Sequence, residues 1–352
     1  MNLARVSTFV LAVLAPFGAA GCSGCAGTAQ RALGVIEGPI NDPGNRTLRR
    51  SILSWGLDVF CKEMLKRNAP LKLVEESPVI GRFYPLQCQQ QELEGGDLFV
   101  TFQGPGYAYT NLSKKLTFTS SGSVRYDQDF QMDGSRMYAQ FRSKEVKGSD
   151  FRVTAIEQPL ANFMNQVNPV AAKFGQQLLS QKLSEGFTVI REPSGEADFS
   201  MGILAPGQKP QHPFAVGGSE RVTYENLRTE VHQGERDFIG PIDIERDGQA
   251  IFVTATVDGA PSADVLLLSR DVGESALNAY LTQAAAQPIP PSVAAEAISQ
   301  GAQLARSWPV PKGRYFVVLD NTASAGPSSP IPNPLDDRAA VVSYLLQIGD
   351  AP

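Results

Sequence analysis

The chain contains 352 residues in proportions ordinary for a globular protein, and its formal net charge is −5 at pH 7. Residues 22–206 carry 20 Lys and Arg against 19 Asp and Glu, whereas residues 207–352 carry 10 against 17. Neither part has the basic stripe that nucleic-acid binding needs, and the acidic part would repel phosphate, so we exclude nucleic acid as a partner. Because the length exceeds the roughly 100–200 residues of a typical domain, we expect two domains.

Residues 1–21 predict a secretory signal peptide. Arg5 is the only charged side chain before an apolar run, Val6 to Ala20, that ends in small residues. The run is shorter than the ~20 apolar residues of a typical membrane-spanning helix. Cleavage near Ala20 as an ordinary signal, and retention as an uncleaved anchor, are the alternatives to the interpretation that follows.

Cys22 directly follows the small residues Ala19, Ala20 and Gly21. This box resembles the bacterial lipoprotein signal, although Ala19 stands where that signal usually has Leu. The resemblance implies that Cys22 is diacylated and anchors the protein in the cell envelope, and Ser23, by analogy with lipoprotein sorting, favours the outer membrane. Two acyl chains give stable anchoring without help from the protein surface. We therefore expect membrane contact through the lipid alone.

The first domain is predicted to occupy residues 46–206, after a flexible tether at residues 22–45 that is rich in Gly, Ala, Asn and Pro. Apolar residues spaced by three and four predict a helix from Arg46 to Asn68, which Pro70 would end. A second helix is predicted from about Pro159 to Ser184 by the same pattern. Both helices have broad apolar faces, so each should be covered by other elements.

Between these helices, residues 71–156 alternate apolar and polar side chains with a period of two. Glycine-containing breaks predict an antiparallel meander of short strands; they stand at 95–96, 104–106, 121–122, 133–134 and 147–148. Two further strands, near 187–190 and 199–203, would complete the sheet as a hairpin. An antiparallel sheet with two apolar helices is an α+β arrangement.

The second domain is predicted at residues 236–350, after a linker and first strands at residues 207–235 that include several Pro and Gly. Weakly alternating apolar runs predict the strands of a β-sandwich, similar to a jelly roll. Residues 274–308 are predicted to insert a helical hairpin, one helix on each side of a proline-rich turn at 288–291.

The stretch 313–321, Gly-Arg-Tyr-Phe-Val-Val-Leu-Asp-Asn, resembles the Gly-x-Tyr-x-x-x-x-Asp-Asn strand of the Golgi-dynamics (GOLD) β-sandwich family. The closing strand at 340–348 and the runs at 251–255 and 264–268 stand where that family has core strands. The resemblance implies a protein-interaction or adaptor module. An Asx turn after an apolar strand would produce the same Asp320-Asn321 pair and remains an alternative.

Two cysteines remain beyond the signal region, Cys61 and Cys88. An exported compartment is oxidising, so we predict that they form a disulfide; two separately buried thiols are the alternative. We expect no metal site and no cofactor, because the only histidines, His212 and His232, do not stand beside a cysteine pair. No nucleophile elbow is present, and we expect both histidines to be surface residues without a catalytic role.

The predicted helices and strands bring many aromatic residues into the first domain, where a curved sheet could enclose an apolar ligand. The residues expected to line such a site are Trp55, Phe60, Phe102, Phe118, Phe163 and Phe174. A filled core is the alternative. The sequence thus predicts a non-enzymatic, lipid-anchored binding protein. An adaptor that docks another envelope protein through the β-sandwich is the second hypothesis, and a hydrolase based on carboxylates is the third.

Overall fold

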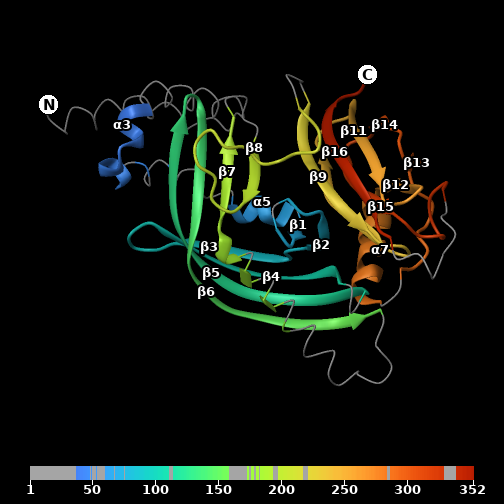
Figure 1. Ribbon diagram of the computed structural model, residues 1–352, viewed down its shortest axis with the longest axis horizontal. Coiled ribbons are helices and arrows are strands. Elements are labelled where there is room, and N and C mark those ends of the chain that lie inside the picture. The colour runs from blue at the N-terminus through green and yellow to red at the C-terminus, as the bar shows by residue number, and fades with distance from the viewer. Residues whose placement is uncertain are drawn as a thin grey trace.

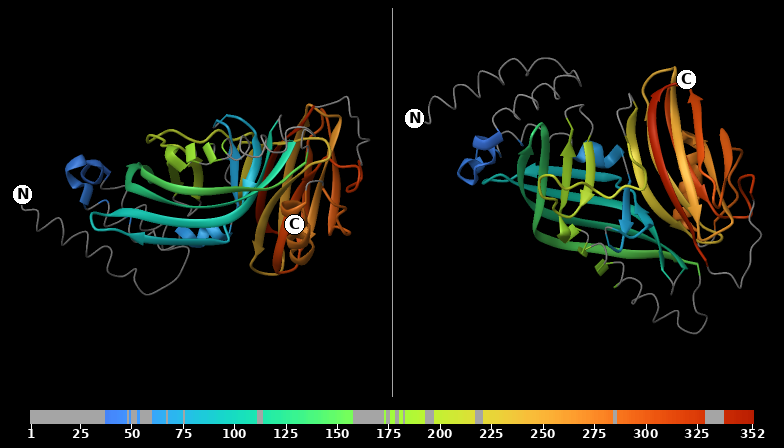
Figure 2. Two further views of the ribbon diagram at one scale, coloured as in Figure 1. Left: turned by 90° about the horizontal axis from the view of Figure 1, so that it is seen from below. Right: turned by 45° about the horizontal axis from the view of Figure 1, so that its top comes forward.

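The computed structural model describes residues 37–47, 60–66, 68–74, 76–110, 114–157, 183–192, 197–216, 221–283, 286–328 and 338–352, with a few isolated positions between them. The described chain is rich in β-strands, as the sequence predicts. We call the described residues up to 216 the N-terminal half and residues 221–352 the C-terminal half. Figures 1 and 2 show α3 near one end of the long axis and the strands of the C-terminal half near the other.

The elements of the N-terminal half whose bounds lie within the described residues are two short helices, one 3-10 turn and eight strands. They are α3 (Glu37–Asn41), η2 (Pro43–Asn45), α5 (Phe60–Lys66), β1 (Ala69–Lys72), β2 (Val79–Phe83), β3 (Gln87–Glu92), β4 (Asp97–Thr110), β5 (Lys114–Asp133), β6 (Arg136–Ile156), β7 (Phe187–Arg191) and β8 (Ala197–Met201). Strands β4 to β8 form the expected antiparallel meander, and β7–β8 is the expected hairpin. Figure 1 shows the long strands curving past α5 and β1.

The strands of this meander are longer than predicted, because three of the expected glycine turns are wrong. Strand β4 runs through Gly104 and Gly106, β5 through 121–122, and β6 through 147–148. Gly104 and Gly106 instead allow a close approach of β2 and the residue after it: a Cβ at Gly104 would collide with the Tyr84 carbonyl oxygen, and one at Gly106 would lie 2.7 Å from the Arg82 carbonyl oxygen. The turns at 95–96 and 133–134 are present.

The even-numbered residues of β4 and β5 form an apolar face that carries the core of the N-terminal half. Leu98, Val100 and Phe102 of β4 pack in it beside Val124 and Tyr126 of β5 and the rings of β6 and β7. The alternation of side chains along a strand directs every second residue to this face, which explains why the period-two pattern identified these strands. The core continues to Ile40 and Leu53 of the N-terminal segment.

Residues 37–45, the last part of the predicted tether, are folded onto β5. The Asn41 side chain donates to the Met132 carbonyl oxygen at 2.6 Å and accepts from the Met132 backbone N at 2.7 Å. Arg49 donates to both carboxylate oxygens of Asp129, at 3.0 and 2.9 Å. Any tether therefore ends before Glu37. The rest of the predicted helix 46–68 is described only in part, and most of the predicted helix 159–184 lies outside the described residues.

The C-terminal half contains two facing antiparallel sheets, which bears out the predicted sandwich. Its elements are β9 (Val222–Val231), β10 (Arg236–Ile244), β11 (Gln249–Asp258), β12 (Ser262–Ser269), α7 (Arg270–Thr282), β13 (Ala294–Ser299), β14 (Leu304–Val310), β15 (Gly313–Asp320) and β16 (Ala340–Asp350). One sheet has the order β14-β11-β16-β9 and the other β10-β15-β12-β13. Apolar side chains of both sheets, among them Val253 and Leu267, fill the space between them.

The predicted helical insertion at 274–308 is only half correct. Helix α7 is present, but the second predicted helix is wrong, because residues 294–299 and 304–310 form β13 and β14. Strand β13 pairs with β12 along six residues, from Ala294 opposite Leu267 to Ser299 opposite Ser262. Alanine has the highest helix propensity of any residue, but intrinsic propensity is a weak determinant, and pairing with an available strand edge overrides it.

The two halves share a sheet. Strand β2 of the N-terminal half lies parallel to β9 of the C-terminal half, with Val79 opposite Thr229, so the hydrogen-bonded strand order runs from β14 to β8 without a break. A separate apolar cluster joins the halves beside this contact: Tyr84 and Tyr107 pack against Phe238, Phe316 and Tyr280 of the C-terminal half. The predicted boundary at 207–235 therefore lies within a continuous structure.

Candidate functional site

Arg82 of β2 lies at the centre of the contact between the halves and is fully buried. Its guanidinium donates from Nε and Nη2 to the two carboxylate oxygens of Asp237, at 2.6 and 2.8 Å. Nη1 donates to Glu225 Oε1 at 3.0 Å and to Asn68 Oδ1 at 2.6 Å, and Nη2 also donates to the Tyr344 hydroxyl at 2.7 Å. All five N–H groups of the guanidinium thus have acceptors.

The charges around Arg82 keep it ionised. Burial acts to lower the pKa of Arg82, but the carboxylates of Asp237 and Glu225 outweigh burial and raise the pKa well above its ordinary value. Tyr344 donates in turn to Glu225 Oε2 at 2.7 Å. A guanidinium that is always charged, and that donates two hydrogen bonds to one carboxylate, is the arrangement expected for a charge buried away from bulk water.

Two tyrosines of the N-terminal half add hydrogen bonds to β10. The Tyr84 hydroxyl donates to the Phe238 carbonyl oxygen at 2.6 Å. The Tyr107 hydroxyl donates to Asp237 Oδ1 at 2.8 Å and accepts from the Phe238 backbone N at 2.8 Å. Burial raises the pKa of both tyrosines well above the ordinary value, so they remain neutral donors. Polar groups and rings together fix β10 against β4.

Next to this cluster, a cavity of about 20 Å³ lies between the halves. Its lining includes Tyr107 and Lys115 from the N-terminal half, and His232, Glu235 and Tyr280 from the C-terminal half. The Lys115 ammonium lies 3.9 Å from Glu235 Oε2 and 3.8 Å from the centre of the Tyr280 ring. The Tyr280 hydroxyl donates to Glu235 Oε2. A volume of this size can hold a water molecule but no organic substrate.

The ionisable groups of this cavity have strongly altered affinities for protons. Burial raises the pKa of Glu235 to about 9, and a hydrogen bond with the Glu157 carboxyl contributes in the same direction. Burial lowers the pKa of Lys115, against the attraction of Glu235 and Glu157. A carboxyl in an apolar setting beside a second carboxyl favours its neutral form. At neutral pH, we infer that Glu235 carries a proton.

His232 closes one side of the cavity. Its ring stacks on Tyr109 with the centroids 3.4 Å apart, and its Nε2 makes a hydrogen bond with Glu230 Oε1. This hydrogen bond lowers the pKa of Glu230. The prediction of a surface position for His232 is wrong, because the side chain is buried at the contact between the halves. Among the described residues, no group of three or more His, Cys, Asp or Glu side chains could hold a metal ion.

The second candidate site is the aromatic face of the N-terminal half. Phe102 and Phe118 are buried there and share Phe83 as a neighbour, at centroid distances of 5.8 and 6.4 Å. Of the other residues predicted to line an apolar site, Trp55, Phe163 and Phe174 lie outside the described residues, and Phe60 begins α5 with its side chain not described.

Gln128 of β5 is the unusual member of this face. It is fully buried between Tyr126 and Phe130, which point the same way along the strand, and it stands opposite Phe141 of β6. Neither atom of its side-chain amide has a hydrogen-bond partner among the described residues. A buried amide without partners costs about 1–3 kcal/mol relative to a satisfied one.

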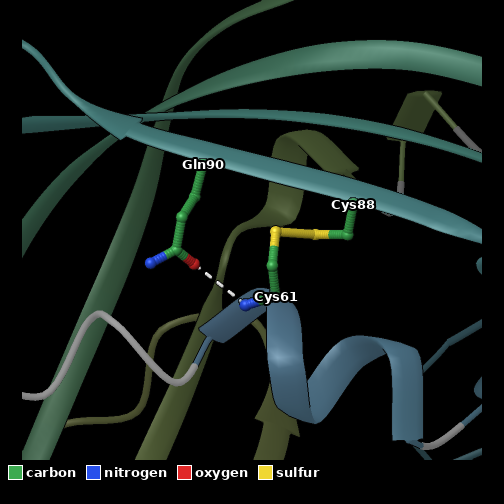
Figure 3. The surroundings of a disulfide bond; sticks show 3 residues. All are labelled: Cys61, Cys88 and Gln90. Atoms are coloured by element: carbon green, nitrogen blue, oxygen red, sulfur yellow. Dashed lines mark hydrogen bonds between the residues drawn. A yellow bond between two sulfur atoms is a disulfide. The ribbon is translucent and has the colours of Figure 1, made fainter.

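The predicted disulfide is present. Cys61 of α5 is bonded to Cys88 of β3, with the Cα atoms 5.3 Å apart (Figure 3). The Cys61 backbone N also donates to the Gln90 side-chain oxygen at 2.9 Å. The bond attaches α5 to an edge of the sheet and so covers the aromatic face. Cys22 lies outside the described residues.

Asp320 and Asn321, from which the family resemblance was drawn, have structural partners. Asp320 forms a buried ion pair with Arg236 and accepts from the Thr322 backbone N at 3.0 Å, which is the bond of an Asx turn. The Asn321 side chain donates to the Val231 carbonyl oxygen at 3.0 Å.

Comparison with known proteins identifies no family. No protein-family model and no curated protein matches the chain. A chain of the Bacillus endospore appendages, a family of disulfide-linked pili, aligns over 40% of this chain and 100% of its own length, with 7% identity and a TM-score of 0.20. A Bombyx mori GH32 β-fructofuranosidase aligns over 77% of this chain and 66% of its own, with 8% identity and a TM-score of 0.14. These similarities are too low to assign a fold family or a function. Among the described residues, no helix has the length and hydropathy of a membrane-spanning segment.

Proposed function

We propose that the protein is a lipid-anchored, non-enzymatic binding protein of the cell envelope whose first domain holds an apolar ligand. In this proposal Cys22 is acylated, the anchor lies in the outer membrane, and residues 46–206 act as an α+β unit in which helices cover the aromatic face of the sheet. The sequence box around Cys22 supports the anchor, and the aromatic face supports the ligand.

Gln128 is the observation on which the ligand depends. In a core that only fills space, Leu or Met at this position would avoid the cost of an unpaired amide. Sites for apolar ligands, in contrast, combine aromatic and aliphatic walls with a few polar groups that fix the ligand's orientation. The fully buried amide between Tyr126 and Phe130 has this character, and it favours a ligand with one hydrogen-bonding group beside an apolar chain.

The test is native mass spectrometry and lipid extraction of the full-length protein purified from envelopes. We expect bound amphiphile in the wild type, and a loss of most of it in Gln128→Leu, which retains the apolar core. Gln131→Leu is the matched control, because Gln131 lies on the opposite face of the same strand. Extracts without bound lipid from the wild-type protein would contradict the proposal.

The anchor has its own test. Cys22→Ser should abolish incorporation of labelled fatty acid and release the protein from the membrane fraction. Cys25→Ser should change neither, because Cys25 lacks the Ala-Ala-Gly box. Equal labelling of the two variants would exclude Cys22 as the attachment point.

A second candidate function is an adaptor that docks another envelope protein through its sandwich. The resemblance of 313–321 to the GOLD strand, together with the observed sandwich, favours this candidate. Photo-crosslinkers at two exposed apolar positions separate the alternatives: Val293 of the C-terminal half is 55% exposed, and Leu86 of the N-terminal half is 70% exposed. A partner captured from Val293 but not from Leu86 would support docking by the sandwich, whereas capture from Leu86 alone would contradict it.

A further inference from the structure

Three buried polar atoms around the cavity between the halves have no hydrogen-bond partner among the described residues. They are Lys115 Nζ, Glu235 Oε1 and His232 Nδ1, and all three residues line the cavity. Each side chain is more than nine-tenths buried. Buried donors and acceptors that converge on one small polar space normally share an ordered water molecule.

The volume and the surrounding charges limit what can bind. A cavity of about 20 Å³ exceeds the ~10–15 Å³ that one water needs and is far below the size of an organic ligand. A cation would be repelled by Lys115, and an anion by the carboxylates of Asp237 and Glu230, which also belong to the lining. A neutral molecule that both donates and accepts hydrogen bonds is compatible with the charges of these lining residues.

We propose that this cavity is a specific site for one water molecule, which bridges Lys115, Glu235 and His232, and that protonated Glu235 keeps the two halves joined through it. The water accepts from the Lys115 ammonium and donates to Glu235 Oε1 and to His232 Nδ1. The N-terminal half supplies one of its partners and the C-terminal half supplies two. Burial and the neighbouring Glu157 carboxyl both raise the pKa of Glu235, which favours its protonated form.

The titratable and charged groups that face Glu235 come from every element packed around it. From the N-terminal half these are Tyr107, Lys115 and Glu157, and from the C-terminal half they are Glu230, His232, Arg236, Asp237 and Tyr280. Arg236 directs its guanidinium to Asp320, Thr322 and Ser324, and Asp237 is committed to Arg82. The Lys115 ammonium, 3.9 Å from Glu235 Oε2, thus remains as a nearby cation without a hydrogen-bond partner among the described residues.

The sign of the pH dependence follows from the raised pKa of Glu235. Below pH 4.5, the ordinary value for this group, the carboxyl is protonated in the folded and unfolded chains alike. Between 4.5 and about 9 only the unfolded chain ionises, so the stabilising contribution of the proton falls as the pH rises and is lost above 9. The lowered pKa of Lys115 acts in the opposite direction, so a variant of Glu235 alone isolates the carboxyl.

The experiment is denaturant unfolding of the full-length protein at pH 6 to 9. Glu235→Gln retains the shape and hydrogen-bonding capacity of the protonated acid but cannot ionise. We expect its midpoint to exceed that of the wild type already at pH 6, and by a margin that grows toward pH 9, because Glu235 of the unfolded wild-type chain ionises above pH 4.5. Glu274→Gln, at a half-exposed carboxylate of α7, should follow the wild type throughout.

Two results would overturn the proposal. A Glu235→Gln midpoint well below that of the wild type at pH 6 would show that Glu235 is an ionised partner of Lys115. A high-resolution crystal structure of the wild type with an empty cavity, or with an ion in it, would exclude the water. Water density within hydrogen-bond distance of at least two of the three atoms, absent in Lys115→Met, would support it.

Discussion

Arg82 joins four segments that are far apart in the sequence: its acceptors stand at 68, 225, 237 and 344. An arginine suits this place because its planar group offers five donors in fixed directions, whereas a lysine has three on one flexible atom. Every acceptor is held by a different part of the fold. Arg82 therefore links the two halves through buried hydrogen bonds and ion pairs.

Replacing Arg82 by Met should lower the free energy of unfolding by about 3–5 kcal/mol, because Asp237 is left buried without its counter-charge. Lysine should recover only part of this loss. Denaturant unfolding measures both variants. Arg270→Met is the matched control, since the Arg270–Glu274 pair is exposed on α7 and should leave the midpoint unchanged. An unchanged midpoint in Arg82→Met would contradict the assigned role.

His212 connects the N-terminal half to the first strand of the sandwich. Its Nε2 lies 2.8 Å from Asp198 Oδ2, and its Nδ1 lies 2.9 Å from the Asn226 carbonyl oxygen. Both neighbours are acceptors, so both bonds form only when both ring nitrogens carry a proton. The hydrogen bond to Asp198 raises the pKa of His212 above its ordinary 6.5.

The stabilisation by His212 should be complete below pH 6.5 and should disappear as the pH rises through the higher folded pKa. His212→Gln should therefore lower the unfolding midpoint at pH 5.5 and have a smaller effect at pH 8.5. Titration of the imidazole by NMR gives the pKa directly. A value at or below 6.5 would remove the basis for this prediction.

At the scale of elements, the disulfide holds the short helix α5 on the edge strand β3. The two cysteines are 27 residues apart, and in the chain-entropy model closing a loop of that length contributes about 3–4 kcal/mol. The double variant Cys61→Ser/Cys88→Ser should lose about this much, measured by denaturant unfolding. The same loss should follow reduction of the wild type. A midpoint insensitive to reductant would show that the bond does not stabilise the fold.

The elements that sequence reasoning identified correctly are those with strong local patterns. Strand β11, for example, was visible as an apolar run, and α7 as a helical period after β12. The failures have tertiary causes. Residues 294–299 contain three alanines and resemble a helix, yet the free edge of β12 makes them a strand. Gly104 and Gly106 look like turn residues, but they allow the close approach of β2 and the residue after it.

At the scale of the whole molecule, the shared sheet and the buried contact predict that the halves unfold together. Calorimetry of the wild type should show a single transition. In Arg82→Met the contact is weakened, and we expect the transition to broaden or to separate into two. Two well-separated transitions in the wild type would show instead that the halves are independent, as the predicted boundary at 207–235 would allow.

The site at the junction could not have been found from the sequence. Lys115 and Glu235 are 120 positions apart, and neither stands in a motif. Glu157 and Tyr280 reach the same place from a strand end and a helix. Among the predicted site residues, Cys61 and Cys88 could be paired from the sequence, because they are the two cysteines that remain beyond the signal region.

The contact between β2 and β9 has a mechanical consequence. Among the described residues, the backbones of these strands pair only at Val79 and Thr229, so the seam between the halves is held mainly by side chains. If the N-terminal end were anchored in a membrane and the sandwich were bound to a partner, tension between the two halves would cross this seam through Arg82 and its acceptors. The rate of rupture under force would then be set at this seam. A load would then separate the two halves first, while the strands within each half stay paired. The hydrogen bonds and ion pairs of Arg82 could form again when the load is removed.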